Sequence, residues 1–467
     1  MSSLNYKFMK KKSYLKSIVM LFLFINHIAI GQCFKEISTG GYHTIAIKTD
    51  NTLWAWGYNN YGQIGDNTSV DKLIPTKIGT DRDWLAISAG YQHTLAIKTD
   101  GTLWSWGNNQ FGQLGDGTTI LKNVPTQIGT DTNWSKISAG YEHNFAIKTD
   151  GTLWAWGHND FGELGDGGTI DKNIPIQIGI ETNWSKIIAG FNLSLAIKTD
   201  GTFWGWGNNG YGELGDGTTI SKLIPTQIGT DTNWDMISNK SMHCLGLKTD
   251  GTLWAWGYNF YGALGDGTTI SKLIPIQLGT DNNWSAIAAG NNYSLASKNN
   301  GTLWSWGYNY FGQLGDGTTV DKHFRTQIGT DNDWKEISTG WVHILALKTD
   351  GTLWVCGSNY HGQLGDGTTV DKHIPTAIAC TTSLANETIV AKNNFTIYPN
   401  PVATTLTIEA NEAITETSIT DCNGRVIKAD KQNNASVTIN IENLQTGIYF
   451  LKIVTENGST VEKIIKE

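Results

Sequence analysis

Residues 101–119 read GTLWSWGNNQFGQLGDGTT, and this stretch recurs in register every 50 residues along the chain. Its copies begin at Asn51, Gly101, Gly151, Gly201, Gly251, Gly301 and Gly351. A fixed period near 50 residues without a helical hydrophobic pattern is typical of stacked or closed arrays of small β units. The repeat therefore decides the fold class before any single residue is considered.

Each repeat predicts four short strands. In the second copy, His93, Leu95 and Ile97 alternate with other residues in the period of two that a β-strand requires. Asp100 and Gly101 follow, and this pair favours a tight hairpin turn because both residues tolerate positive φ. Seven such units predict an all-β chain with a seven-bladed β-propeller. An open solenoid is the alternative, but both end repeats match the middle ones instead of forming polar caps.

The repeats resemble those of the regulator of chromosome condensation family. The resemblance rests on the G-x-x-H strand start, on W-G followed by N-x-x-G-Q-L-G, and on the P-x-x-I strand, all repeated over residues 34–378. It implies a propeller that binds a macromolecule through one face, because the family includes nucleotide exchangers for a nuclear GTPase and secreted bacterial propellers that bind proteins. Exchange activity is not expected here, since the units are uniform and carry no inserted loop.

The 50-residue period stops after residue 380, and residues 381–393 have the composition of a linker. Residues 394–467 alternate like strands around an Asn423-Gly424 turn, which predicts a small C-terminal β-sandwich. The segments YPNPV, LQTGIYFLKI and KIIK resemble the C-terminal sorting domain of type IX secretion substrates in Bacteroidetes. The resemblance implies the type IX machinery as a partner and export across the outer membrane, followed by removal or surface anchoring of this domain. A carbohydrate-binding sandwich is the alternative.

Residues 1–31 predict a Sec signal peptide, with lysines at 10–12, an apolar run over 18–30 and cleavage before Gln32. A membrane anchor is the alternative, although the apolar run is short for a span. The expected mature protein is a secreted or cell-surface monomer without a transmembrane segment, and its propeller spans residues 32–380. The net charge of −8 and the absence of a basic run beyond the N-terminus argue against a nucleic-acid partner.

The five cysteines show no metal-ligand spacing. Cys33 and Cys380 flank the repeats, and the first and last blades of a closed ring are neighbours, so we predict a disulfide between these two residues. Two unpaired thiols are the alternative. The strand at 373–378 is expected to fill a gap in the first blade and so to close the ring by strand exchange.

Residues that recur in every copy indicate structure rather than catalysis. The histidines His43, His93, His143, His243 and His343 share one repeat position and predict hydrogen bonds between strands or blades. Paired tryptophans such as Trp104 and Trp106 lie two residues apart, so both rings project from one strand face and predict packing against a neighbouring blade, with a sugar-binding stack as the alternative. The Gly and Asp residues of the GQLGDG segment predict a tight loop.

Function is better sought where the repeat symmetry breaks. Glu163 and Glu213, with Asp160 nearby, occupy loop positions that hold Gln or Ala in other copies, and two carboxylates about 5 to 9 Å apart would suit acid/base chemistry. No catalytic set, cofactor motif or metal-ligand motif accompanies them, so a hydrolase is the least favoured function.

Aromatic residues crowd into the N-x-x-G loops of copies five to seven, which is the composition of a binding hot spot. The predicted ligand-binding residues are Tyr258, Phe260, Tyr261, Tyr308, Tyr310, Phe311 and Tyr360. The sequence thus predicts a non-enzymatic propeller without a cofactor or metal, which engages a protein ligand through one face. A glycan-binding or adhesive propeller is the alternative.

Overall fold

The computed structural model describes residues 34–378, 395–421, 425–455 and 458–467, and these residues form two compact units divided at Cys380. The predicted signal peptide, the linker, both cysteines of the predicted disulfide and the Asn423-Gly424 turn lie outside the described residues. The described residues include no helix long and apolar enough to cross a membrane.

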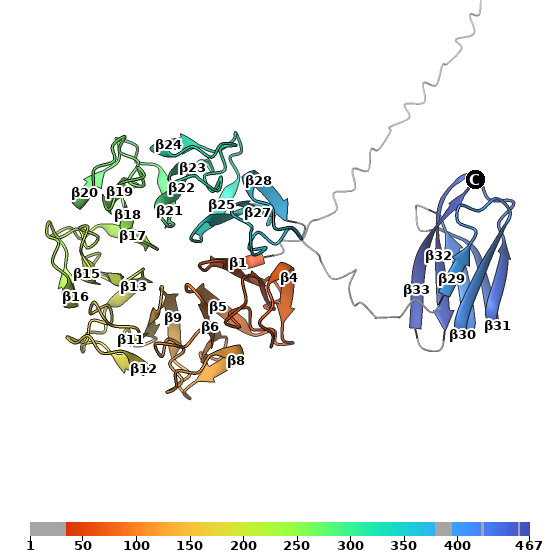
Figure 1. Cartoon of the computed structure of the whole chain (residues 1–467), viewed down its shortest axis with the longest axis horizontal. Coiled ribbons are helices and arrows are strands. Elements are labelled where there is room, and N and C mark those ends of the chain that lie inside the picture. The colour runs from red at the N-terminus through yellow and green to blue at the C-terminus, as the bar shows by residue number, and fades with distance from the viewer. Residues whose placement is uncertain (1–33, 379–394, 422–424, 456–457) are drawn as a thin grey trace, which may run out of the picture. The chain divides into compact units, whose positions relative to one another are not determined.

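The first unit is a seven-bladed propeller, as the repeat predicts. Seven four-stranded antiparallel sheets stand around a central axis, and each sheet uses four strands that are consecutive in the chain (Figure 1). Blades one to four contain β1 (Phe34–Thr39), β2 (His43–Lys48), β3 (Leu53–Gly57), β4 (Lys72–Ile78); β5 (Trp84–Ala89), β6 (His93–Lys98), β7 (Leu103–Gly107), β8 (Lys122–Ile128); β9 (Trp134–Ala139), β10 (His143–Lys148), β11 (Leu153–Gly157), β12 (Lys172–Gln177); β13 (Trp184–Ala189), β14 (Leu193–Lys198), β15 (Phe203–Gly207), β16 (Lys222–Gln227). Blades five to seven contain β17 (Trp234–Asn239), β18 (His243–Lys248), β19 (Leu253–Gly257), β20 (Lys272–Gln277); β21 (Trp284–Ala289), β22 (Tyr293–Lys298), β23 (Leu303–Gly307), β24 (Lys322–Gln327); β25 (Trp334–Thr339), β26 (His343–Lys348), β27 (Leu353–Gly357), β28 (Lys372–Ile378).

The ring closes by contact between the innermost strands β25 and β1. The expected strand exchange is wrong, because β28 completes its own blade through the pairs Leu353 with Ile378 and Val355 with Thr376. Blade one needs no borrowed strand, since β4 already occupies its outer edge. Closure therefore uses no strand shared between blades, although two backbone hydrogen bonds cross it, from the N–H of Trp341 to the carbonyl oxygen of Gly41 at 3.3 Å and from the N–H of Gly367 to that of Leu73 at 2.9 Å.

The Asp-Gly turns and the long loops are fixed by local side-chain hydrogen bonds. Gly101 has φ of 78°, and Asp100 Oδ1 accepts hydrogen bonds from the N–H of Thr102 at 3.0 Å and from its hydroxyl at 2.7 Å. In the loop that follows β7, Asn109 Nδ2 donates to Asp116 Oδ1 at 3.2 Å, and Asn109 Oδ1 accepts the N–H of Leu114 at 2.9 Å. The GQLGDG segment is thus a self-satisfied loop, which confirms its predicted structural role.

Tryptophans hold neighbouring blades together. Trp106 is fully buried against Leu53, Ala55 and other apolar residues of blade one, and Trp104 packs on the same cluster. Trp106 Nε1 also donates to the carbonyl oxygen of Gln63 across the blade interface at 2.9 Å. The predicted inter-blade packing is therefore confirmed.

The second unit is a small β-sandwich made from one continuous sheet around its own core. Its strands are β29 (Phe395–Tyr398), β30 (Thr405–Thr420), β31 (Val426–Asn440), β32 (Gly447–Thr455) and β33 (Gly458–Lys466). The long strand β30 pairs with β29 over its first half and with β32 over its second half, and it pairs with β31 along both halves with a register shift between Glu409 and Ile414. Buried residues such as Leu406, Ile419 and Leu451 fill the interior.

Candidate functional site

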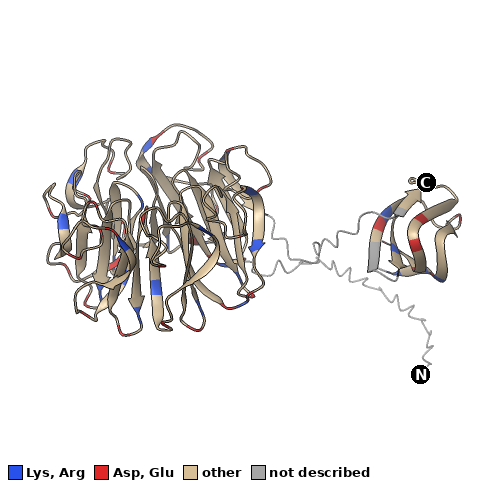
Figure 2. Cartoon of the chain, turned by 60° about the horizontal axis from the view of Figure 1, so that its bottom comes forward, with Lys and Arg blue, Asp and Glu red and all other residues tan. Residues whose placement is uncertain are grey.

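The long loops of all blades emerge on the same face of the propeller. In each antiparallel sheet, the turn after the first strand and the loop after the third strand leave from the same edge. Tyr42 of the first turn and Tyr58 of the long loop accordingly have ring centroids 6.4 Å apart. We call this side of the ring the loop face. Charged residues are scattered over the propeller (Figure 2).

Seven aromatic side chains of blades four to six form an unbroken chain of ring contacts on the loop face, with centroid separations from 4.9 to 6.5 Å. We call them the aromatic arc, and they are Tyr211, Tyr258, Phe260, Tyr261, Tyr308, Tyr310 and Phe311. The structure thus brings together six of the seven aromatic residues that the sequence singles out. The seventh, Tyr360, lies in the next blade, where its ring contacts His361 at 4.9 Å.

Four of these rings are exposed, and Tyr211 is the least exposed of the four, at 46%. The exposed fractions are 63% for Phe260, 67% for Tyr310 and 76% for Tyr360, whereas Tyr258 and Tyr308 are half-buried. Phe260, Tyr310 and Tyr360 occupy one loop position, which is exposed in every blade; the other blades place Asn60, Gln110, Asp160 and Gly210 there. Since polar residues serve equally well at this position elsewhere, the three rings are not required for blade packing.

A hollow of about 680 Å³ opens beside the arc, between Phe311 and Tyr360. Its wall includes Tyr42, Val370 and His361. His361 Nδ1 lies 2.8 Å from Asp71 Oδ2, and this contact joins blade seven to blade one. The hollow therefore continues the aromatic surface across the closure of the ring.

A second aromatic cluster, which the sequence analysis did not single out, fills the centre of the loop face. Tyr91, Tyr141 and Trp341 have centroids 4.3 to 5.5 Å apart, and Phe191 lies 4.5 Å from Tyr141. These residues share the repeat position after the S-A-G segment, where other blades have Gly41, Ser241 and Asn291. The variation at this repeat position was the feature of the sequence from which the cluster could have been predicted. We call them the axial cluster.

The two glutamates considered for acid/base chemistry are each engaged within their own loop. Glu163 is buried, with Oε1 2.7 Å from His158 Nδ1 and Oε2 accepting the N–H of Phe161 at 2.7 Å. Glu213 is also buried, and its Oε2 accepts the N–H of Tyr211 at 2.7 Å. Neither carboxylate is presented to a substrate, so both carboxylates act as loop-positioning groups.

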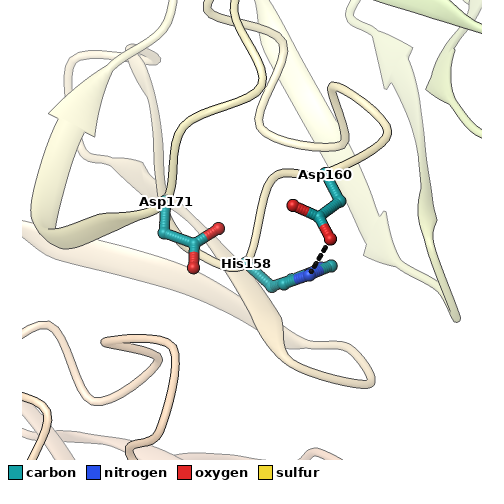
Figure 3. Close-up of side chains that lie close together, drawn as sticks. All are labelled: His158, Asp160 and Asp171. Carbon is teal, nitrogen blue, oxygen red and sulfur yellow. Dashed lines mark ion pairs between the residues drawn. The ribbon is translucent and has the colours of Figure 1, made fainter.

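His158 is a histidine whose surroundings favour its charged form. Burial disfavours its imidazolium form, but the hydrogen bond that it donates to Glu163 and the charges of Glu163, Asp171 and Asp160 outweigh burial and raise its pKa to about 9. Nitrogen or oxygen atoms of His158, Asp160 and Asp171 lie within 4.8 Å of one another (Figure 3). If the Nε2 proton were lost, these three side chains could hold a divalent cation with Glu163 orienting the imidazole.

The recurring histidines connect adjacent blades, which confirms their structural interpretation. His93 Nε2 lies 2.7 Å from Asn144 Oδ1 of the next blade, and burial lowers the pKa of His93 to about 4. Where the next blade offers Ile344 instead of a polar partner, Tyr293 replaces the histidine and donates its hydroxyl to the carbonyl oxygen of His343 at 2.7 Å.

Family comparisons agree with this architecture. The profile described as RCC1-like domain matches residues 137–400. Profiles described as regulator of chromosome condensation (RCC1) repeat match residues 50–97 and 100–147, and also 34–63 and 84–113. The profile described as secretion system C-terminal sorting domain matches residues 396–467. Both resemblances seen in the sequence are thereby confirmed.

Individual relatives are more distant. The ultraviolet-B receptor UVR8 of Arabidopsis thaliana is 36% identical over 44 residues, which are 9% of this chain and 10% of that protein. The match therefore spans only about one tenth of that relative. The structure of human WBSCR16 is 22% identical with a TM-score of 0.64, covering 70% of this chain and 94% of that one. Yeast RCC1 (Prp20), solved bound to Kap60, is 21% identical with a TM-score of 0.64, covering 74% and 85%. These structures establish a shared fold.

Proposed function

The chain belongs to the RCC1-like domain family and ends in a type IX secretion sorting domain, and from this premise we propose that it is a secreted or cell-surface protein whose loop face binds a protein ligand. The type IX machinery would be its export partner. The proposed ligand site consists of the aromatic arc, Tyr360 and the hollow between them.

One observation carries the proposal. Phe260, Tyr310 and Tyr360 stand at equivalent exposed positions of three successive blades, while the remaining blades have no aromatic residue there. Exposed aromatic side chains on a rigid scaffold are the residues that dominate binding energy in protein interfaces. Their half-buried neighbours hold them in place, so little conformational entropy is lost when a partner docks.

A protein ligand fits this surface better than a hydrolase substrate does. The candidate acid/base residues Glu163 and Glu213 are buried in their own loops, whereas the three exposed rings at the equivalent loop position extend over three blades. A protein of the same fold, yeast RCC1 (Prp20), was solved in complex with the protein Kap60.

The test replaces the three rings at this position together, as F260A/Y310A/Y360A, in the full chain. The matched control is N60A/Q110A/D160A, which alters the same loop position in blades one to three. Both proteins serve as baits for surface proteins of the producing cells and are applied in parallel to a glycan array. We expect the aromatic variant to lose at least about tenfold in affinity for its protein ligand, given roughly 1 to 2 kcal/mol per hot-spot ring, while the control binds normally. Equal binding by both variants contradicts the proposal, and capture on the glycan array alone favours the glycan alternative.

A further inference from the structure

The strongest break in the repeat lies inside the propeller rather than on its loop face. The innermost strand of a typical blade runs into a glycine, as at Gly40, Gly90 and Gly140, but the fifth blade has Lys240 at this position. Six blades thus leave the axis of the ring free of a side chain at this level, and one blade fills it with a cation.

Lys240 reaches across the axis to the opposite side of the ring. Its Nζ donates to the carbonyl oxygen of Thr39 in blade one and lies 3.3 Å from the Thr39 hydroxyl. Above it, Tyr91, Tyr141 and Trp341 of the axial cluster leave a hollow of only about 20 Å³. Lys240 and the axial cluster therefore close the channel at the loop face.

Below Lys240 the channel widens into a cavity of about 310 Å³. Hydroxyl groups surround it at one level, and they belong to Ser38, Ser88, Ser138, Ser238 and Ser338. Four of these oxygens each accept a backbone N–H from the next blade at 2.9 to 3.0 Å. Since that bond uses an oxygen lone pair, the hydroxyl proton remains able to donate into the cavity.

Lys240 has no anionic partner in the part of the propeller that the structure describes. No carboxylate oxygen lies within 4.0 Å of its Nζ, and its hydrogen-bond acceptors are the two oxygens of Thr39. Lys240 is half-buried, and burial lowers the pKa of its amine to about 7. An unpaired cation in such surroundings is costly, and an anion placed beside it would offset the cost.

The other titratable groups facing Lys240 do not supply that charge. Burial lowers the pKa of His43 and of His343 well below 6.5, so both imidazoles are neutral at physiological pH. Glu36 and Glu336 stand on the same wall four residues earlier in their strands, roughly 13 Å away along the axis. On the facing blades, Lys136 donates to the carbonyl oxygen of Ser185 and Lys186 pairs with Asp235 at 2.6 Å.

We propose that the central channel is a binding site for a small organic anion, whose compact anionic headgroup pairs with the Lys240 ammonium and accepts hydrogen bonds from the ring of serine hydroxyls. The cavity admits a small molecule but not a folded partner. This site is separate from the proposed loop-face site, because Lys240 and the axial cluster lie between the two.

The purely structural explanation is that Lys240 ties blade five to blade one and binds nothing. The two explanations differ for K240M, which keeps most of the side-chain length without the charge. A structural tie predicts a lower melting temperature and no effect of anions on Lys240. An anion site predicts a melting temperature that is unchanged or higher, together with the loss of anion binding.

The experiment uses the full chain with 13C-labelled lysine and follows the Lys240 Cε resonance, which is assigned by its absence in K240M. Acetate and sulfate are the probes, because neither changes its charge between pH 6 and 8. We expect 50 mM of at least one probe to raise the Lys240 pKa by about one unit or more. Affinity for that probe should be about tenfold weaker at pH 8 than at pH 6, since binding requires the ammonium form.

Glu36 titrates over the same range, because burial, against the hydrogen bond from Ile87, raises its pKa to about 7. E36Q therefore serves as the control for the pH effect, and K186M as the control for a lysine of the same channel. Both variants should keep the probe-induced shift. In K240M, the Cε resonance of Lys186, which lines the same cavity, should show no saturable change on addition of either probe. If K240M does not fold, K240R must retain binding. A Lys240 pKa that neither probe moves overturns the proposal.

Discussion

The buried pair of His158 and Glu163 allows a sharp test of how the loops are stabilised. Blade two contains a natural uncharged version, in which Asn108 and Gln113 occupy the same two positions. Gln113 Oε1 accepts the N–H of Phe111 at 2.9 Å, just as Glu163 accepts the N–H of Phe161. We therefore predict that H158N/E163Q converts the loop of blade three into the blade-two form at little cost.

The single substitutions should be costly. H158N leaves the fully buried Glu163 carboxylate without its cation, which typically destabilises a protein by about 3 to 5 kcal/mol. E163Q keeps a hydrogen-bond acceptor beside a now neutral imidazole and should cost about 1 to 2 kcal/mol. The double variant should lie within about 1 kcal/mol of the wild type, so the coupling energy should be at least about 3 kcal/mol.

The pH dependence follows from the sign of the His158 pKa shift. Because its pKa is about 9 in the folded protein and near 6.5 in the unfolded chain, the stabilisation is complete below pH 6.5 and disappears as pH rises through 9. The shift corresponds to at most about 3 kcal/mol, since solvent screens part of the interaction of this partly exposed imidazole. Urea unfolding of the four proteins at pH 6.5 and 9.5 measures both effects. Additive destabilisation by the two substitutions, or a wild-type advantage that persists at pH 9.5, would refute the reasoning.

Three further predictions concern the rest of the chain. W106F should destabilise the propeller by about 1 to 2 kcal/mol in urea unfolding, because the carbonyl oxygen of Gln63 loses an inter-blade hydrogen bond. Deleting residues 394–467 should leave a folded, monomeric propeller that stays in the periplasm of a type IX-competent host, and its normal release into the medium would contradict this. Non-reducing peptide mapping of the mature protein should recover Cys33 joined to Cys380; a free Cys33 peptide excludes this disulfide.

The sequence predicted the repeating architecture well because the patterns that favour strands and hairpin turns occur in seven successive copies. Alternation fixed the strands, and Asp100-Gly101 fixed the hairpin. Strand exchange was wrongly expected because the pattern gives the order of the strands but not the point at which one blade ends. The aromatic residues of copies five to seven were found because they break symmetry at neighbouring blades of a ring.

Other contacts could not be derived from spacing. His158 and Glu163 meet inside an irregular loop, where no periodicity relates side-chain directions. Lys240 touches Thr39, which lies 201 residues earlier, and only the diameter of the closed ring decides that its side chain can span the axis. The replacement of glycine by lysine at position 240 was visible in the sequence. Its structural consequence depends on which groups line the central channel, and the sequence does not give these.

Some repeat positions hold the same residue in nearly every blade and others vary, and the hydrogen bonds of the propeller explain this difference. Asn109 and Asp116 satisfy the backbone of the loop from within, and Trp106 satisfies the carbonyl oxygen of the preceding blade. The exposed position of the same loop takes part in none of these bonds, so Asn60 and Tyr310 can stand there with a stability difference of about 0.5 kcal/mol or less. Folding therefore leaves this position free, so the aromatic residues that stand there in three adjacent blades are not required for the stability of the loop.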